Sequence, residues 1–142
     1  MKIHVFRLDT ELPLPKHSHP GDAGVDLRSV IDASLAPGDR ILVPTGVAFE
    51  IPAGHCGLVL PRSGLALRSG IGIANSPGLI DSGYRGELKV MLINHGSEPF
   101  AIVRGDRIAQ LVITPFVTQD IVEINDLSAT ARGDGGYGST GA

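Results

Sequence analysis

Apolar and polar residues alternate in short runs along this chain. Residues 25–28 read apolar, polar, apolar, polar, and residues 3–7 are rich in types that favour extended backbone. Turn signals such as Pro37-Gly38 and Pro44-Thr45-Gly46 separate these runs. Many short strands divided by regular turn signals predict an all-β sandwich or barrel. The expected strands cover residues 3–7, 25–28, 32–35, 40–43, 47–50, 57–60, 71–74, 87–94, 100–103 and 108–114, with 87–94 the longest clean strand.

Three stretches do not follow this alternation. Residues 63–68 are compatible with one or two helical turns, for which Ser63 would be the N-cap. Residues 75–87 contain three turn signals and predict a tight hairpin. Residues 116–132 contain no glycine or proline, and their apolar positions fit a helical period about as well as a strand. The fold should therefore contain at most one short helix besides its strands.

Composition narrows the class of protein. The chain has 142 residues, enough for one domain with a substantial core, and it shows no internal repeat. Its 19 glycines and 10 prolines leave little uninterrupted length for helices. A net charge of −3 argues against a general nucleic-acid binder, which would carry a basic face. An anionic ligand must then be held by local arginines, backbone N–H groups or a bridging cation.

Cysteine and histidine usage gives no sign of a disulfide or a structural metal. Cys56 is the single cysteine, which excludes an internal disulfide and is consistent with a reducing compartment. His17 and His19 have no obvious third ligand, and His55-Cys56 has no partner pair at zinc spacing. No run resembles a signal peptide or approaches the ~20 apolar residues of a membrane span. We expect a cytoplasmic protein that binds neither membranes nor nucleic acid.

Residues 75–87 (NSPGLIDSGYRGE) carry the first candidate chemistry. The glycines allow backbone groups to approach a ligand closely. Asp81 lies among small residues that would leave it open to a water, and Tyr84 follows three positions later. An acid that activates water and a ring that packs on a sugar would suit nucleotide hydrolysis. Taken alone, however, the stretch favours a tight hairpin in which Asp81 caps a turn.

Two further segments could bind phosphate. At 62–64, Arg62 and the start of a short helix could form an anion site, although an ordinary capped helix with an exposed arginine explains the same residues. Residues 132–141 look like a glycine-rich phosphate loop, but no lysine precedes Ser139-Thr140, so this is not a Walker A loop. Arg132 could contact a terminal phosphate and Tyr137 could stack on a base. The alternative is a disordered, solubilising tail.

Asp106 is expected to hold the turn before strand 108–114.

Five segments together resemble a known family. In chain order they are AGVDLRS at 23–29, PRSGLA at 61–66, the stretch at 75–87, RGDRIAQL at 104–111 and RGDGGYGSTG at 132–141. They resemble the five signature motifs of the trimeric dUTPases, the deoxyuridine triphosphate nucleotidohydrolases. Each segment alone is weakly diagnostic. Five in the family's order, spread almost end to end, are very specific.

The resemblance implies a fold, an assembly and a reaction. It implies a jelly-roll-like β-barrel over residues 1–127 and a flexible, glycine-rich C-terminal arm over 128–142 that closes over a neighbouring subunit's site. It also favours a strand for the first half of residues 116–132. The assembly would be a homotrimer with sites at subunit interfaces. The reaction would be Mg²⁺-dependent hydrolysis of dUTP at the α-phosphorus to dUMP and pyrophosphate, which lowers dUTP and supplies the dTMP precursor.

The resemblance also implies residue roles. Asp81 would be the general base, and Asp26 would hold Mg²⁺ through water together with the triphosphate. Tyr84 would pack against the deoxyribose, where a ribose 2′-OH would clash. Tyr137 stands where the family most often has Phe, and stacking survives that change. The other implied substrate contacts are Arg62, Ser63, Gly64 and Gln110 on the triphosphate, Arg132 on the terminal phosphate, Asn75 on the base or a phosphate, and the backbone from Gly78 to Lys89 on the uracil edge.

Two alternative functions remain compatible with the sequence. A dCTP deaminase shares the trimeric β fold, but such enzymes need an acid at the cytosine amino group and lack the complete glycine-rich tail seen here. A non-catalytic nucleotide-sensing module would be expected to have lost the acid or the tail arginine. Both Asp81 and Arg132 are present in this chain.

Overall fold

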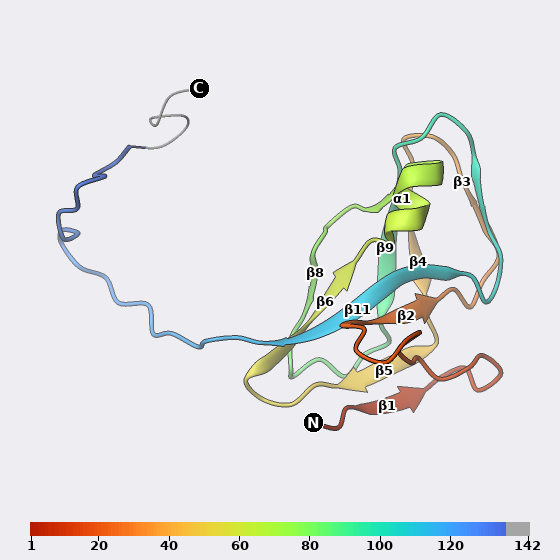
Figure 1. Ribbon diagram of the computed structural model, residues 1–142, viewed down its shortest axis with the longest axis horizontal. Coiled ribbons are helices and arrows are strands. Elements are labelled where there is room, and N and C mark those ends of the chain that lie inside the picture. The colour runs from red at the N-terminus through yellow and green to blue at the C-terminus, as the bar shows by residue number, and fades with distance from the viewer. Residues whose placement is uncertain (136–142) are drawn as a thin grey trace.

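The computed structural model describes residues 1–135 and shows a mainly β fold with one short helix in that range (Figure 1). The elements are β1 (His4–Arg7), β2 (Gly24–Arg28), β3 (Ala33–Leu35), β4 (Arg40–Pro44), β5 (Val47–Glu50), β6 (His55–Leu60), α1 (Ser63–Ser69), β7 (Ile71–Ile73), β8 (Gly78–Ile80), β9 (Lys89–Asn94), β10 (Phe100–Ile102) and β11 (Arg107–Pro115). The prediction of an all-β, jelly-roll-like fold with at most one short helix is confirmed. At 7 residues, α1 is far too short to cross a membrane, and no longer helix occurs in the described range.

Antiparallel pairing joins the strands into four small sheets. The largest has the order β2-β11-β6-β8, and a second has the order β4-β9-β7. Two-stranded sheets pair β1 with β5 and β10 with β3. Neighbours in these sheets are mostly far apart in sequence, so the fold depends on long-range contacts rather than on local hairpins.

The core lies between the inward faces of these sheets. Leu27 and Leu111 from the four-stranded sheet and Val43 and Leu92 from the three-stranded sheet are all buried in one apolar cluster. Along β9 every second residue is buried, as expected for a strand with one face on the core. The polar side-chain groups of the buried Asn94 all have hydrogen-bond partners. Its side-chain amide donates to the Leu35 and Glu98 carbonyl groups, and its side-chain oxygen accepts the Gly96 N–H.

Residues 75–87 do not form a self-paired hairpin, so that prediction is wrong. β8 pairs with β6, whereas β9 pairs with β4 and β7 in the other sheet. The stretch between β8 and β9 therefore passes from one sheet to the other. Burial of apolar residues on two separate faces outweighs the local turn signals, and the strand predicted at 87–94 begins at Lys89. The longest strand is β11, with 9 residues.

The helix begins one residue earlier than the N-cap prediction required. Arg62 occupies the N-cap position with extended backbone, and its carbonyl accepts the N–H groups of Leu65 and Ala66. Ser63 is thus the first helical residue, and the N-cap makes no side-chain hydrogen bond. The C-terminal end is a glycine cap, in which Gly70 adopts a φ of 67°.

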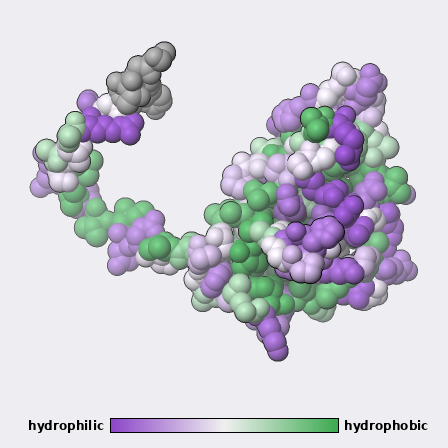
Figure 2. All heavy atoms as spheres, viewed as in Figure 1, coloured by the Kyte–Doolittle hydropathy of each residue, from purple (hydrophilic) through white to green (hydrophobic). Residues whose placement is uncertain are grey.

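The strand expected at the start of residues 116–132 is not present. The Phe116 N–H donates to the Gly54 carbonyl, and the chain then leaves the body beyond β11 (Figure 1). Val117 and Ile121 are 84% and 94% exposed, and apolar residues recur along this segment in Figure 2. A strand needs a neighbouring backbone edge, and residues 116–135 lie beside none in the described part of this single chain.

Candidate functional site

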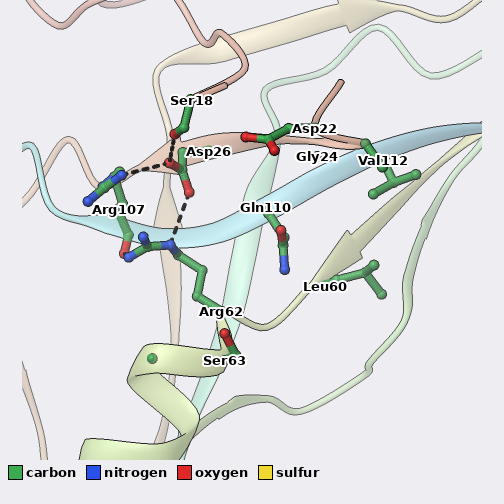
Figure 3. Close-up of a pocket in the computed structure, with 12 residues that line it drawn as sticks. Ser18, Asp22, Gly24, Asp26, Leu60, Arg62, Ser63, Arg107, Gln110 and Val112 are labelled. Carbon is green, nitrogen blue, oxygen red and sulfur yellow. Dashed lines mark hydrogen bonds and ion pairs between the residues drawn. The ribbon is translucent and has the colours of Figure 1, made fainter. Parts of the chain in front are cut away.

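One cavity of about 390 Å³ gathers polar residues from three strands and the start of the helix. We call it the polar cavity. It lies where β2, β6 and β11 run side by side and where the chain turns from β6 into α1 (Figure 3). Its lining residues are Ser18, Asp22, Ala23, Gly24, Asp26, Leu60, Arg62, Ser63, Gly64, Arg107, Gln110 and Val112.

Strand register brings the polar side chains together. Gln110 on β11 is the partner of Asp26 on β2 and of Leu60 on β6. Directly paired residues share one face of a sheet, so Asp26 and Gln110 both face the cavity. The Gln110 side-chain amide donates to the Pro61 carbonyl at 2.9 Å, which ties β11 to the start of the Arg62 segment.

Asp26 is held between two guanidinium groups at the centre of the polar cavity. Its Oδ1 lies 3.0 Å from Arg62 Nε, and its Oδ2 lies 3.1 Å from a terminal nitrogen of Arg107. The Ser18 hydroxyl donates to Oδ2 at 3.3 Å (Figure 3). The two arginines outnumber the carboxylate between them, so this cluster has an excess of positive charge suited to a phosphate chain.

Arg107 is a cavity residue to which the sequence analysis assigned no role. Simple alternation places residues 107 and 110 on opposite faces of a strand. The pairing of β11 with β2 shifts between Arg107 and Ala109, which leaves Ile108 as an extra residue. The resulting bulge turns Arg107 toward the same cavity as Gln110. Ser18 and Asp22 were missed as well, and only the polar run before β2 hinted at them.

A second cavity, of about 350 Å³, lies along the stretch between β8 and β9. We call it the loop cavity. The Tyr84 N–H donates to the Asp81 carbonyl at 3.1 Å, and the Tyr84 hydroxyl donates to the Glu87 carbonyl at 2.9 Å. The side chains of Asp81 and Tyr84 are both exposed. The residues that line this cavity are Leu42, Leu79, Ile80, Asp81, Tyr84, Glu87, Leu88 and Lys89.

The predicted site residues divide between the two cavities, which have no lining residue in common. The polar cavity holds Asp26, Arg62, Ser63, Gly64 and Gln110, whereas the loop cavity holds Asp81, Tyr84 and Lys89. One chain therefore does not bring the predicted base next to the predicted phosphate-binding residues.

Asn75, Gly78 and Arg132 line neither cavity. Asn75 and Gly78 lie next to each other, since a Cβ built on Gly78 would be 3.5 Å from Asn75 Nδ2. Arg132 is exposed in the C-terminal segment, where its Nε donates to the Gly135 carbonyl. Tyr137 lies outside the described residues.

The donor set of the polar cavity fits a magnesium ion shared with phosphates. Residues 1–135 contain no cluster of three or more His, Cys, Asp or Glu side chains that could hold a metal alone. Asp26 and Asp22 both line the polar cavity. Mg²⁺ at phosphate sites is usually bound by one or two carboxylates together with phosphate oxygens and water.

Comparisons with known proteins agree with the motif pattern. The dUTPase family model matches residues 10–141. A deoxyuridine 5′-triphosphate nucleotidohydrolase of Corynebacterium glutamicum is 59% identical over 140 residues, covering 98% of this chain and 94% of that protein. In a solved structure, a mutant dUTPase of Staphylococcus bacteriophage 80alpha with dUpNHpp has a TM-score of 0.91 at 28% identity and covers 99% of each chain.

A second solved structure concerns metal binding. A mutant dUTPase from phage phi11 of S. aureus has a TM-score of 0.82 at 27% identity, covering 89% of this chain and 98% of that one. That structure is described as revealing the coordination of a structural Mg(II) ion. The family model covers nearly the whole chain and a close relative aligns almost end to end, so this chain belongs to the dUTPase family.

Proposed function

We propose that this dUTPase hydrolyses dUTP to dUMP and pyrophosphate in a site formed by its two cavities. The polar cavity binds the triphosphate, and the loop cavity binds the deoxyuridine and supplies the base. The main support for phosphate binding in the polar cavity is the pair of arginines around Asp26. Their nitrogens lie 3.0 Å and 3.1 Å from its carboxylate oxygens, and Gln110 lines the same cavity. Fixed cations beside hydrogen-bond donors are what binding of a phosphate chain requires.

In the polar cavity, Arg62 and Arg107 contact phosphate oxygens, and Ser63, Gly64 and Gln110 donate further hydrogen bonds. Asp26 would hold the Mg²⁺ ion. When bound, the metal neutralises charge on the phosphates. The arginines hold the chain so that the α-phosphorus is presented to the attacking water.

In the loop cavity, Asp81 orients a water and accepts its proton as the water attacks the α-phosphorus. Its exposed carboxylate is accessible to such a water in the free chain. The Tyr84 ring packs against the deoxyribose and excludes a ribose. The backbone from Gly78 to Lys89 reads the uracil edge, and Asn75 contacts the base or a phosphate.

The complete site is built from neighbouring copies in a homotrimer. Separation of the two cavities in one chain supports this, because residues of the same reaction otherwise have no common site. Residues 128–142 then form the arm that brings Arg132 and Tyr137 over a neighbour's nucleotide. The exposed apolar residues of segment 116–127 are available to pack on another chain.

Mixed oligomers test this arrangement directly. We expect Arg62→Ala and Asp81→Asn each to be nearly inactive alone. Mixed by co-expression, they should regain activity at about one quarter of the sites, where an intact polar cavity meets an intact loop cavity. Oligomers of each variant alone, prepared by the same co-expression procedure, are the controls. Absence of recovery in verified mixed oligomers would contradict a shared site. Assay of the wild type with dUTP, dCTP, dTTP and UTP would separate this function from dCTP deamination.

A further inference from the structure

We infer that Gly86 is a positioning residue that sets the place of the Tyr84 ring and, through it, the preference for deoxyribose over ribose. This inference rests on the proposed role of Tyr84 at the sugar. It assigns the sugar selectivity in part to a residue that does not itself contact the sugar.

The Tyr84 ring folds back over Gly86. Its hydroxyl donates to the carbonyl of Glu87 at 2.9 Å, which draws the ring toward the Arg85-Gly86 segment. A Cβ built on Gly86 would lie 2.5 Å from the Tyr84 hydroxyl oxygen, 2.7 Å from Cζ and 3.0 Å from Cε2. Real Cβ atoms essentially never come closer than 3.0 Å to another atom, and the first two distances are shorter, so a side chain at 86 requires either the ring or the backbone to move.

The segment that accepts the tyrosine hydroxyl is itself anchored to the body. The Gly46 N–H donates to the Glu87 carboxylate at 2.9 Å. The next residue, Leu88, donates its N–H to the Val47 carbonyl at 2.8 Å. The Leu88 carbonyl accepts both the hydroxyl and the N–H of the buried Thr45, at 2.6 Å and 3.2 Å. The turn between β4 and β5 thus holds the acceptor in place.

Steric conflict at Gly86 must therefore be relieved by the ring rather than by the anchored backbone. Tyr84 is 45% exposed and has solvent on one side into which it can turn. The φ of Gly86 lies outside the left-handed region, so alanine is compatible with the local backbone. The substitution changes mainly the space beside the ring.

The same loop offers a matched control. A Cβ built on Gly83 would meet nothing within 4 Å, and its φ also lies outside the left-handed region. Gly83→Ala and Gly86→Ala therefore add the same methyl group to the same loop. They differ in whether that group meets Tyr84.

The experiment compares kcat/KM for dUTP and UTP in wild type, Gly86→Ala, Gly83→Ala, Tyr84→Ala and the Tyr84→Ala/Gly86→Ala double variant. Gly86→Ala should narrow the dUTP to UTP ratio by about tenfold, the low end of what steric fit in a pocket provides. Gly83→Ala should keep the wild-type ratio. In the Tyr84→Ala background, Gly86→Ala should cause no further change, because its effect passes through the ring.

Each outcome is decisive. If Gly86→Ala leaves the dUTP to UTP ratio unchanged while Tyr84→Ala alters it, the positioning role of Gly86 is overturned and the sugar contact of Tyr84 stands. An unchanged ratio in Tyr84→Ala overturns both. An equal effect of Gly86→Ala with and without Tyr84 shows a general disturbance of the loop and also overturns the inference. If Gly86→Ala does not fold, Glu87→Ala tests the same positioning of the ring, because it removes the contact between the Glu87 carboxylate and the Gly46 N–H. Glu87→Ala should then narrow the dUTP to UTP ratio, and Glu87→Gln should restore it.

Discussion

Asp26 and Arg62 form a partly buried ion pair, with Nε 3.0 Å from Oδ1 and side chains only 18% and 25% exposed. The pair joins β2 to the residue that caps α1, and Arg107 completes it from β11. One carboxylate thereby holds in place the two arginines proposed to bind the phosphates. The same carboxylate is the proposed anchor for Mg²⁺, so metal binding and the arrangement of the arginines are coupled.

Replacing Asp26 with Asn should therefore separate metal binding from phosphate binding. We expect the Mg²⁺ concentration for half-maximal dUTP hydrolysis to rise about tenfold or more, as for loss of a group that orients a metal's ligands. Affinity for pyrophosphate without metal should be kept or increased, because the variant retains both arginines and loses a competing anion. Metal titration of activity and calorimetry with pyrophosphate measure the two effects. Asp39→Asn, which lines neither cavity, is the control, and an unchanged Mg²⁺ requirement in Asp26→Asn would contradict the assignment.

Asp81→Asn should bind dUTP nearly as well as the wild type but hydrolyse it at least ~10²-fold more slowly, the low end of general-base contributions. The amide cannot accept the proton of the attacking water, while the shape of the loop cavity is retained. Single-turnover kinetics with a separate binding titration distinguish the two effects. Near-normal turnover by the variant would remove Asp81 from the mechanism.

Gly46→Ala should destabilise the fold by about 2–5 kcal/mol, combining left-handed backbone strain with overpacking. Gly46 has a φ of 69°, and its Cβ would lie 2.7 Å from Asp9 Cβ and from Val30 Cγ1. Gly38→Ala is the matched control, because its φ of 81° is similar but its Cβ would meet nothing within 4 Å. It should cost only about 1–2 kcal/mol. Urea unfolding of both variants measures the difference, and equal losses would show that packing at Gly46 contributes nothing.

The stability of this protein in acid should depend on Asp9. A hydrogen bond from the Arg104 guanidinium, 2.6 Å away, and the N–H of Glu11 lower the pKa of Asp9 below its ordinary 3.8. The ionised form is thus favoured in the folded state. The resulting stabilisation is complete above the unfolded pKa and is lost as the pH falls through the folded one.

Asp9→Asn should accordingly lose less stability than the wild type when the pH is lowered from about 5 to about 2. Thermal unfolding across this range is the measurement. Asp39→Asn removes a carboxylate that has no arginine partner among the described residues, and it should retain the wild-type decline. Parallel declines in wild type and Asp9→Asn would show that the Arg104 pair does not contribute.

Removal of residues 128–142 should leave the fold and its thermal unfolding unchanged but abolish most activity. Residues 128–134 are all exposed, so their removal costs the core no buried apolar area. The activity should fall because, in the proposed mechanism, the arm supplies a phosphate cation, Arg132, and shields the site from water.

Limited proteolysis provides a second measurement on the full chain. A non-hydrolysable dUTP analogue with Mg²⁺ should protect the arm, whereas dUMP should not, because only the triphosphate offers contacts for Arg132. Equal cleavage with and without ligand, or full activity of the truncated protein, would show that the segment serves only solubility.

Local features of this protein could be predicted from the sequence alone. Alternation and turn signals predicted short strands, and Gly38 and Gly46 occupy turns with positive φ where Pro-Gly and Pro-Thr-Gly had indicated them. Asp106 holds the turn before β11, as expected: its N–H donates to the Val103 carbonyl and its carboxylate accepts the Val103 N–H. Five motifs in order were sufficient to recognise the dUTPase family. The strands and turns follow from residues close together in the chain, whose backbone preferences act over one turn or one strand.

The arrangement of the site was decided only by tertiary structure. The stretch containing Asp81 looked like a hairpin, yet its flanking strands belong to different sheets because each buries its apolar face against residues far along the chain. A bulge in β11 brings Arg107 beside Asp26, and no alternation pattern indicates that shift. Glu87, whose carbonyl accepts the Tyr84 hydroxyl, is itself bonded through its carboxylate to a turn some forty residues earlier, at Gly46. Strand pairing and close packing are set by the sum of long-range contacts, and local sequence preferences are too weak to determine them.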